Sequence, residues 1–220
     1  MELLFQRVGF VALIFFAPVA FAKNVSISSL DVSQMTAGWS VAKAGQSVVG
    51  SPLAIHGEKY ADGVGTCPAS KFRVQLGDNA KRFTAKVGVD DSAHNRGSVE
   101  FIVEGDGKIL WRSGVLKGGD AAKSVNVNLD GVKMLTLNVT DAGDGINDDY
   151  ADWADAKIEM NAGAVPVVLP PFEQFSVGTG NFSLNFEVGG DGRLYQRAVG
   201  AADANAKLLR TEECYPQAGD

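Results

Sequence analysis

The sequence has 220 residues, of which 45% are hydrophobic and 21% charged, and its formal net charge is -6. Enough apolar side chains are present for a packed core, so the composition excludes an intrinsically disordered chain. The acidic balance argues against a nucleic-acid-binding protein, because phosphate recognition needs clustered Lys and Arg. The 26 glycines, without long runs of strong helix formers, favour short strands joined by tight turns.

The first 22 residues predict a signal peptide. Arg7 supplies positive charge, and the apolar segment 8–21 is shorter than a comfortable membrane span. Ala20-Phe21-Ala22 has the small-x-small pattern of a cleavage site, which makes Lys23 the expected mature N-terminus. An uncleaved anchor is the alternative. We therefore expect an exported chain, periplasmic or extracellular, without a membrane segment after cleavage, since no later stretch is long and apolar enough to span a bilayer.

Residues 25–160 alternate repeatedly between apolar and polar side chains, as half-buried strands do. The alternating segments are 72–76, 83–89, 99–103, 125–129, 135–139 and 154–160. Turn residues that tolerate positive φ separate several of them, at Gly77-Asp78-Asn79, Gly105-Asp106-Gly107 and Asp130-Gly131. Strands at this spacing predict an all-β fold, an antiparallel β-sandwich or jelly roll.

The character of the sequence changes after Met160. Residues 162–174 contain three prolines and predict an extended, semi-rigid linker. Beyond it, 182–188 and 194–199 predict two strands joined by a Gly-rich turn. A hairpin and a tail cannot bury a core alone, so residues 175–220 are expected to open a second β domain that continues past Asp220.

The two cysteines, Cys67 and Cys214, allow one disulfide or none in an exported chain. They fall in different predicted domains, which favours two separate thiols. A catalytic Cys–His pair with His56 or His94 is the alternative, although nothing in the local sequence supports it.

The segment 141–155 is the richest in functional side chains. Its oxygen donors suit calcium, for which Asp141, Asp144 and Asp155 are the candidate ligands, although the spacing is not that of an EF-hand. The segment equally suits a sugar, whose hydroxyls need polar partners and whose apolar face stacks on aromatic rings. A third alternative is a solvated acidic loop with Trp153 in the core. The candidate sugar ligands are Asn147, Asp149, Tyr150, Asp152 and Trp153.

Other residues carry weaker signals. His94 lies in a polar stretch and is a further candidate ligand, although solvation of a surface loop is the favoured explanation for it. Trp39 and Trp111 are expected in the core rather than as sugar platforms. No residue is assigned a catalytic role, because a glycosidase needs two carboxylates at a fixed separation, and neighbours such as Asp90 and Asp91 point to opposite faces of a strand.

Several motifs, in order, resemble the NPCBM/NEW2 type of carbohydrate-binding module over about residues 28–160. They are Tyr60-Ala-Asp-Gly-Val-Gly-Thr66, Gly88-Val-Asp-Asp91, Gly105-Asp-Gly-Lys108, Asp141-Ala-Gly-Asp-Gly145 and Ala151-Asp-Trp-Ala-Asp155. The resemblance implies a galactose-binding-like jelly roll beside a secreted glycosidase, with galactose-type glycans as ligands and calcium often structural. Two positions depart from the family pattern, because Cys67 and Tyr150 stand where relatives commonly have His.

The segment from Phe175 resembles the opening β-sandwich of melibiase-type α-galactosidases, whose catalytic barrel this chain lacks. The predicted organisation is a signal peptide at 1–22, a carbohydrate-binding module at 23–161, a linker at 162–174 and the start of the α-galactosidase-like domain at 175–220. We expect a monomeric module that targets a glycosidase to galactose-containing glycans. The alternatives are an adhesion or structural β-sandwich without a sugar site, or a small hydrolase that uses its acidic loop.

Overall fold

The computed structural model describes residues 22–170, together with the backbone of 173–179, 182–188 and 194–198. Residues 1–21 of the predicted signal peptide and the segment that contains Cys214 lie outside the described residues. Among those described, no helix is long and apolar enough to cross a membrane. The helical residues form three single 3₁₀ turns, η1 (Ile27–Ser29), η2 (Val32–Gln34) and η3 (Asp91–Ala93).

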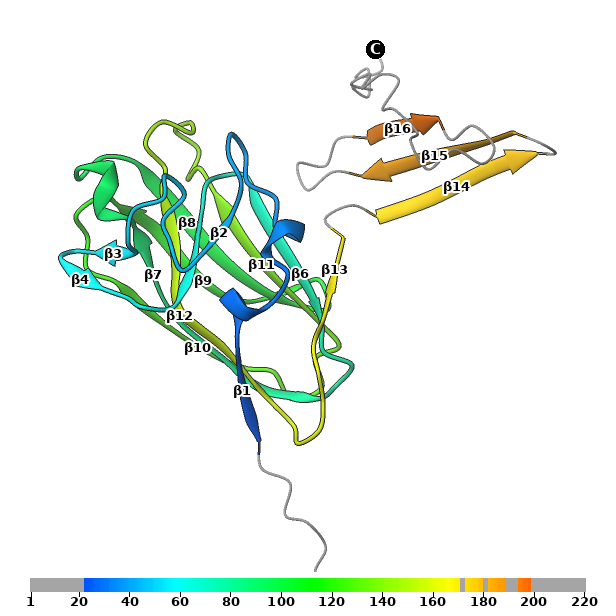
Figure 1. Ribbon diagram of the computed structural model, residues 1–220, viewed down its shortest axis with the longest axis horizontal. Helices are drawn as coiled ribbons and strands as arrows, with labels where there is room; N and C mark the ends of the chain where they lie inside the picture. The colour runs from blue at the N-terminus through cyan, green and yellow to red at the C-terminus, as the bar shows by residue number, and fades with distance from the viewer. Residues whose placement is uncertain (1–21, 171–172, 180–181, 189–193, 199–220) are drawn as a thin grey trace, which may run out of the picture.

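One face of the module is a six-stranded antiparallel sheet (Figure 1). Its order is β10 (Lys123–Asn128), β7 (Ala80–Val89), β12 (Ala151–Met160), β5 (Gly63–Thr66) and β2 (Lys43–Ala44), and β1 (Lys23–Ser26) also pairs with β12. The opposite face is a five-stranded antiparallel sheet. Its order is β13 (Val167–Leu169), β6 (Ser70–Gln75), β11 (Met134–Thr140), β8 (Ser98–Gly105) and β9 (Lys108–Lys117).

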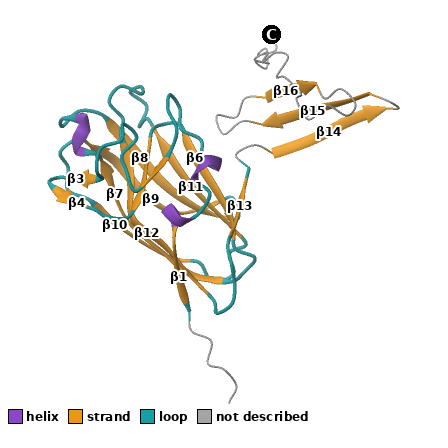
Figure 2. Cartoon of the chain, in the orientation of Figure 1, coloured by secondary structure: helices purple, strands orange, loops and turns teal. Residues whose placement is uncertain are grey.

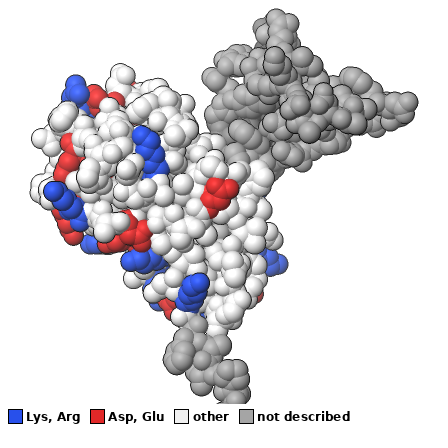
Figure 3. Space-filling view, in the orientation of Figure 1, with Lys and Arg blue, Asp and Glu red and all other residues white. Residues whose placement is uncertain are grey.

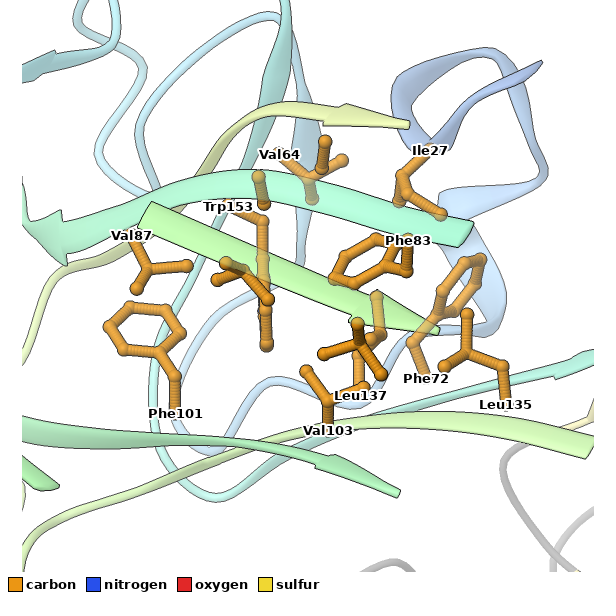
Figure 4. Close-up of a cluster of buried hydrophobic side chains, with 14 of the residues drawn as sticks. Ile27, Val64, Phe72, Phe83, Val87, Phe101, Val103, Leu135, Leu137 and Trp153 are labelled. Carbon is orange, nitrogen blue, oxygen red and sulfur yellow. The ribbon is translucent and has the colours of Figure 1, made fainter. Parts of the chain in front are cut away.

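The core lies between the two sheets, and both contribute large side chains to it (Figure 4). The six-stranded sheet supplies Val64, Phe83 and Trp153, and the five-stranded sheet supplies Phe72 and Phe101, all fully buried. The rings of Phe83 and Phe101 meet Trp153 edge-on, with centroids 5.9 and 4.9 Å away. The predicted all-β sandwich is therefore confirmed, because alternation in the sequence places one apolar row from each strand in this core.

The outer face of the six-stranded sheet is partly covered by a second, smaller cluster. The hairpin of β3 (Ala54–Ile55) and β4 (Glu58–Lys59) lies over it, and Leu53, Ile55 and Tyr60 are buried there against Ala154. A side chain at Gly88 of β7 would collide with Ile55, which shows how closely this hairpin approaches the sheet. Both faces of β12 are consequently buried near its start.

A β-bulge changes which residues of β12 face the core. The register against β7 shifts between Ala154 and Lys157, and Asp155 has φ of 47°. Trp153 before the bulge and Ala156 after it both belong to the main core, whereas Ala154 faces the outer cluster. The unbroken alternation predicted for 154–160 is thus wrong at Ala154, because a bulge inserts one residue into the alternation.

Part of the predicted linker is a strand of the module. Residues 167–169 form β13, which pairs with β6 at the edge of the five-stranded sheet. Pro166 precedes this strand and Pro170 follows it, as expected of an edge strand, where a missing N–H is tolerated. Further along, β14 (Glu173–Thr179), β15 (Phe182–Val188) and β16 (Leu194–Ala198) form an antiparallel sheet, which includes the two strands predicted there.

Candidate functional site

Four connecting segments meet at one end of the sandwich (Figures 1 and 2). They are the segment 36–53, the η3 segment 90–97, the β9–β10 connection 118–122 and the β11–β12 loop 141–150. Backbone hydrogen bonds join three of them: the N–H of Gly118 donates to the carbonyl of Gly97 over 3.0 Å, and the N–H of Asp90 donates to the carbonyl of Tyr150 over 2.8 Å. The segment 36–53 meets the 141–150 loop through the rings of Trp39 and Tyr150. The 141–150 loop therefore lies against segments distant in sequence.

Ser98, the first residue of β8, fixes two acidic side chains of the 141–150 loop. Its N–H donates to Asp149 Oδ1 over 2.7 Å, and its hydroxyl donates to Asp144 Oδ2 over 2.6 Å. Arg96 pairs with Asp148 over 3.2 Å. A side chain at Gly97, whose φ is 79°, would collide with the carbonyl of Asp148. Only glycine permits this approach, and the approach sets the position of both carboxylates.

A hollow of about 280 Å³ opens between these segments. It is lined by Gly97, Ser98, Lys117, Asp144, Gly145, Asn147 and Asp149. Asp149 is 1% exposed, and its Oδ2 atom has no hydrogen-bond partner among the described residues. Burial raises the pKa of Asp149 to about 6; the Ser98 N–H opposes this shift, and the charges of Asp144, Asp141 and Asp148 add to it. Asp149 therefore forms part of the wall of the hollow with one carboxylate oxygen unpartnered and closed off from solvent.

An aromatic pair belongs to the same end of the molecule. Trp39 and Tyr150 lie 5.7 Å apart between ring centroids, with their planes tilted by 55°. Trp39 is 45% exposed, so its predicted place in the core is wrong. Trp111 is half-buried and packs against the core as predicted. Tyr150 directly follows Asp149, which brings the aromatic pair and the hollow close together in the chain.

Two predicted ligands, Trp153 and Asp152, are not accessible to a sugar. Both are 0% exposed, because β12 begins at Ala151 and they are strand residues rather than loop residues. Trp153 points into the main core, as Figure 4 shows. Asp152 is on the opposite face, which the β3–β4 segment covers. These two residues do not line the hollow and do not fit a direct contact with a sugar there, and Trp153 lies in the core, as one of the alternatives expected.

Asp152 pairs with Asp90 inside the protein. Asp90 Oδ2 accepts the N–H of Ala54 over 3.1 Å, and its Oδ1 accepts the N–H of Ser92 over 2.9 Å and also the Ser92 hydroxyl. Burial, together with a hydrogen bond to Asp90 and its charge, raises the pKa of Asp152 well above its usual range. The raised pKa favours the protonated form of Asp152, whose two oxygens have no other hydrogen-bond partner among the described residues, so a buried acid stands beside Asp90 where β12 meets the η3 segment.

The three predicted calcium ligands do not converge. Asp141 and Asp144 share the 141–150 loop, where Asp141 Oδ1 accepts the N–H of Gly143 over 3.0 Å. Asp155 lies on the β12 bulge, and its N–H donates to the carbonyl of Asp62. Within the described part of the chain, no three His, Cys, Asp or Glu side chains are placed to share a metal ion. The predicted set therefore does not fit a calcium ion, and calcium binding stays a prediction.

The remaining predicted residues divide between the hollow and its surroundings. Asn147 and Asp149 line the hollow, whereas His94 ends η3 as an exposed residue with φ of 54° and is not part of the lining. Cys67 is a buried free thiol, so it offers no surface contact in place of the family's His. Sequence reasoning missed Ser98, Lys117 and Trp39, because nothing near them in the sequence indicates proximity to the acidic loop.

Two facing antiparallel sheets with a polar hollow among the loops at one end define a β-sandwich module of the ligand-binding kind. The chain belongs to the NPCBM/NEW2 domain family, whose model matches residues 23–159. This confirms the resemblance predicted from the sequence.

Two curated relatives support the same assignment. A Renibacterium salmoninarum protein named as an endo-alpha-N-acetylgalactosaminidase is 38% identical over 122 residues, or 56% of this chain. Alpha-1,3-galactosidase B of Akkermansia muciniphila is 37% identical over 138 residues, or 61% of this chain. The matched region spans only 8% and 17% of the length of these two proteins.

Solved structures of similar fold include two from Clostridium perfringens. The CBM51 of GH95, determined in complex with methyl-galactose, superposes with a TM-score of 0.58 at 29% identity, over 62% of this chain and 99% of that one. CBM51-2 of ZmpB, determined with its INT domains and in complex with GlcNAc, also gives a TM-score of 0.58, at 30% identity over 64% of this chain and 32% of that one.

Proposed function

We propose that the chain binds a terminal galactose-type sugar in the hollow at the loop end of the sandwich. The observation that carries this proposal is Asp149, an almost fully buried carboxylate that lines the hollow with one oxygen unpartnered. A buried charged acceptor without a donor is costly, and a sugar hydroxyl is a suitable donor. The similar CBM51 module solved with methyl-galactose supports this choice of ligand class.

The other lining residues complete the chemistry that a sugar needs. The Asn147 side chain can donate and accept, the Lys117 ammonium donates, and Asp144 accepts, so hydroxyls of either polarity find partners around one ring. The neighbouring Trp39 and Tyr150 offer apolar faces to the carbon skeleton or to the next sugar of a chain. An open hollow of this kind yields weak binding, because each hydroxyl exchanges water for protein at little net gain.

The role of such a module is to raise the local concentration of substrate for an attached enzyme. The named relatives are glycosidases many times longer than the matched region. We infer that this module targets a longer glycoside hydrolase of the α-galactosidase class to galactose-containing glycans, and that the strands beyond β13 open its next domain. Weak binding suffices, since a tethered module needs only to increase the effective concentration of the enzyme at the polymer.

Isothermal titration of the chain with methyl-galactoside and lactose tests the proposal. We expect saturable binding that weakens at least tenfold in Asp149→Asn, because the amide can still accept from Ser98 but offers no acceptor to a hydroxyl. Asp130→Asn is the matched control, since it removes an equal charge from the turn between β10 and β11, away from the lining of the hollow. Equal affinity of the two variants, or no binding by the unmodified chain, would contradict the proposal.

A further inference from the structure

The carboxylates around the hollow form a local concentration of negative charge. Asp144 and Asp149 line it, and Asp141 lies in the same loop. Asp148 forms an ion pair with Arg96. Lys117 is the cation among the residues that line the hollow, and its charge opposes those of Asp141, Asp144 and Asp149. The side of the molecule in Figure 3 shows acidic and basic side chains interspersed, without a large patch of one sign.

The carboxylates are held in place rather than free to move away from a ligand. Ser98 holds Asp144 and Asp149 at the same time, and the close approach of Gly97 to Asp148 fixes the loop that carries them. Asp149 Oδ2 is enclosed and has no hydrogen-bond partner among the described residues, so no contacting donor offsets its charge. The charges of Asp144, Asp141 and Asp148 add to the rise in the pKa of Asp149, as expected of carboxylates held near one another.

We infer that the hollow accepts uncharged sugar ends and rejects ends that carry a sulfate or a carboxylate, a specificity that rests on the proposed function of this site. A neutral sugar donates a hydroxyl to Asp144, which is exposed at the hollow, and adds no charge beside Asp149. An anionic substituent on the same sugar brings a like charge within a few ångströms of fixed carboxylates, where screening by salt is incomplete. Like charges placed together in this way are an effective means of excluding the wrong ligand.

The inference is tested by titrating the full chain with lactose and with lactose 3′-sulfate, which differ by one charged group. We expect the sulfated sugar to bind at least tenfold more weakly. In Asp144→Asn the ratio of the two dissociation constants should fall at least threefold, whereas Asp130→Asn should leave the ratio unchanged. Raising NaCl from about 20 to 500 mM should also reduce the ratio, because the Debye length shortens.

The outcomes separate this inference from the proposed function on which it rests. If lactose binds and its sulfate binds equally well or better, the charge selection is wrong and the sugar site stands. If the sulfate binds weakly but neither Asp144→Asn nor high salt changes the ratio, the rejection is steric and the inference is again wrong. If neither sugar binds, the proposed function itself fails.

Discussion

Asp149 connects the stability of the module to pH. The pKa of this carboxyl is raised to about 6 in the folded chain, against 3.8 for an ordinary Asp. A raised pKa means that the folded state holds the proton more tightly, so the contribution to stability is fully present below pH 4 and is lost as pH rises through 6. Above pH 6 the ionised, buried carboxylate destabilises the fold.

We therefore predict that Asp149→Asn is stabilised relative to the unmodified chain as pH rises from about 4 to 7. The gain should be about 1 to 3 kcal/mol, given that one unit of pKa corresponds to 1.36 kcal/mol. Urea unfolding of both proteins across this range measures it. If the free energies of unfolding of the two proteins change with pH in the same way, Asp149 does not have a raised pKa in the folded chain.

The Asp90–Asp152 pair makes a contrasting prediction. Asp152→Asn should change the free energy of unfolding by less than about 1 kcal/mol at pH 7, because an amide donates to Asp90 as the protonated acid does. Asp90→Asn should cost about 2 to 4 kcal/mol, since one amide group cannot accept from both Ala54 and Ser92. Urea unfolding measures both changes. Equal losses in the free energy of unfolding for the two variants would contradict a protonated Asp152.

Trp153 on β12 belongs to the core, whereas Trp39 in the segment 36–53 is a surface residue. Trp153→Ala should destabilise the module by about 3 to 5 kcal/mol, because it empties a fully buried site between Phe83 and Phe101. Trp39→Ala should leave the melting temperature nearly unchanged and reduce the change in Trp fluorescence caused by sugar. Thermal melts and fluorescence titrations of both variants test the division, which a stable, folded Trp153→Ala would overturn.

The approach of the η3 segment to the 141–150 loop can be tested with a matched pair of glycines. Gly97 and Gly107 have φ of 79° and 76°, but a side chain would collide with Asp148 only at Gly97, whereas the space around Gly107 is open. Both alanine variants carry a similar backbone strain of about 1 kcal/mol. Gly97→Ala should lose more stability and also sugar affinity. If both variants behave alike, the contact does not shape the hollow.

The strands were predictable from the sequence, and the site only in part. Alternation reports burial on one face, so segments such as 72–76 and 83–89 gave both the strands and their core residues. Alternation did not show which side chains of 151–155 are buried, because the bulge and the covering β3–β4 hairpin depend on residues distant in sequence. The oxygen-rich composition of 141–155 indicated Asn147 and Asp149 as site residues. Nothing in the sequence indicated Ser98 and Lys117, since only the pairing of β8 with its neighbours brings them to the loop.

At the scale of the whole molecule, the predicted calcium ion can be tested directly. If calcium binds, excess EDTA should lower the melting temperature by several degrees and added calcium should restore it, because a metal bound only to the folded state raises its stability by mass action. Asp155 is separated from Asp141 and Asp144, so such a site needs ligands other than these three together. A melting temperature that EDTA leaves unchanged would contradict calcium binding.

The module should not be an enzyme by itself. Glycoside cleavage needs two carboxylates about 5 to 10 Å apart across a sheltered cleft, with a raised pKa for the acid. The pair Asp90–Asp152 is enclosed, and Asp149 is almost fully buried in the wall of a hollow between surface loops. We predict no hydrolysis of aryl α-galactosides by the 220-residue chain. Turnover that Asp149→Asn abolished would make the hollow an active site instead of a binding site.

The central claim is that a neutral galactose-type sugar binds among the loops that surround Asp149. The most direct measurement is the change in backbone amide NMR signals of the chain on titration with methyl-galactoside. We predict saturable shifts concentrated at Gly97, Ser98, Gly145, Asn147 and Asp149, which line the hollow. Shifts centred elsewhere on the sandwich, or none at the highest soluble sugar concentration, would contradict the account.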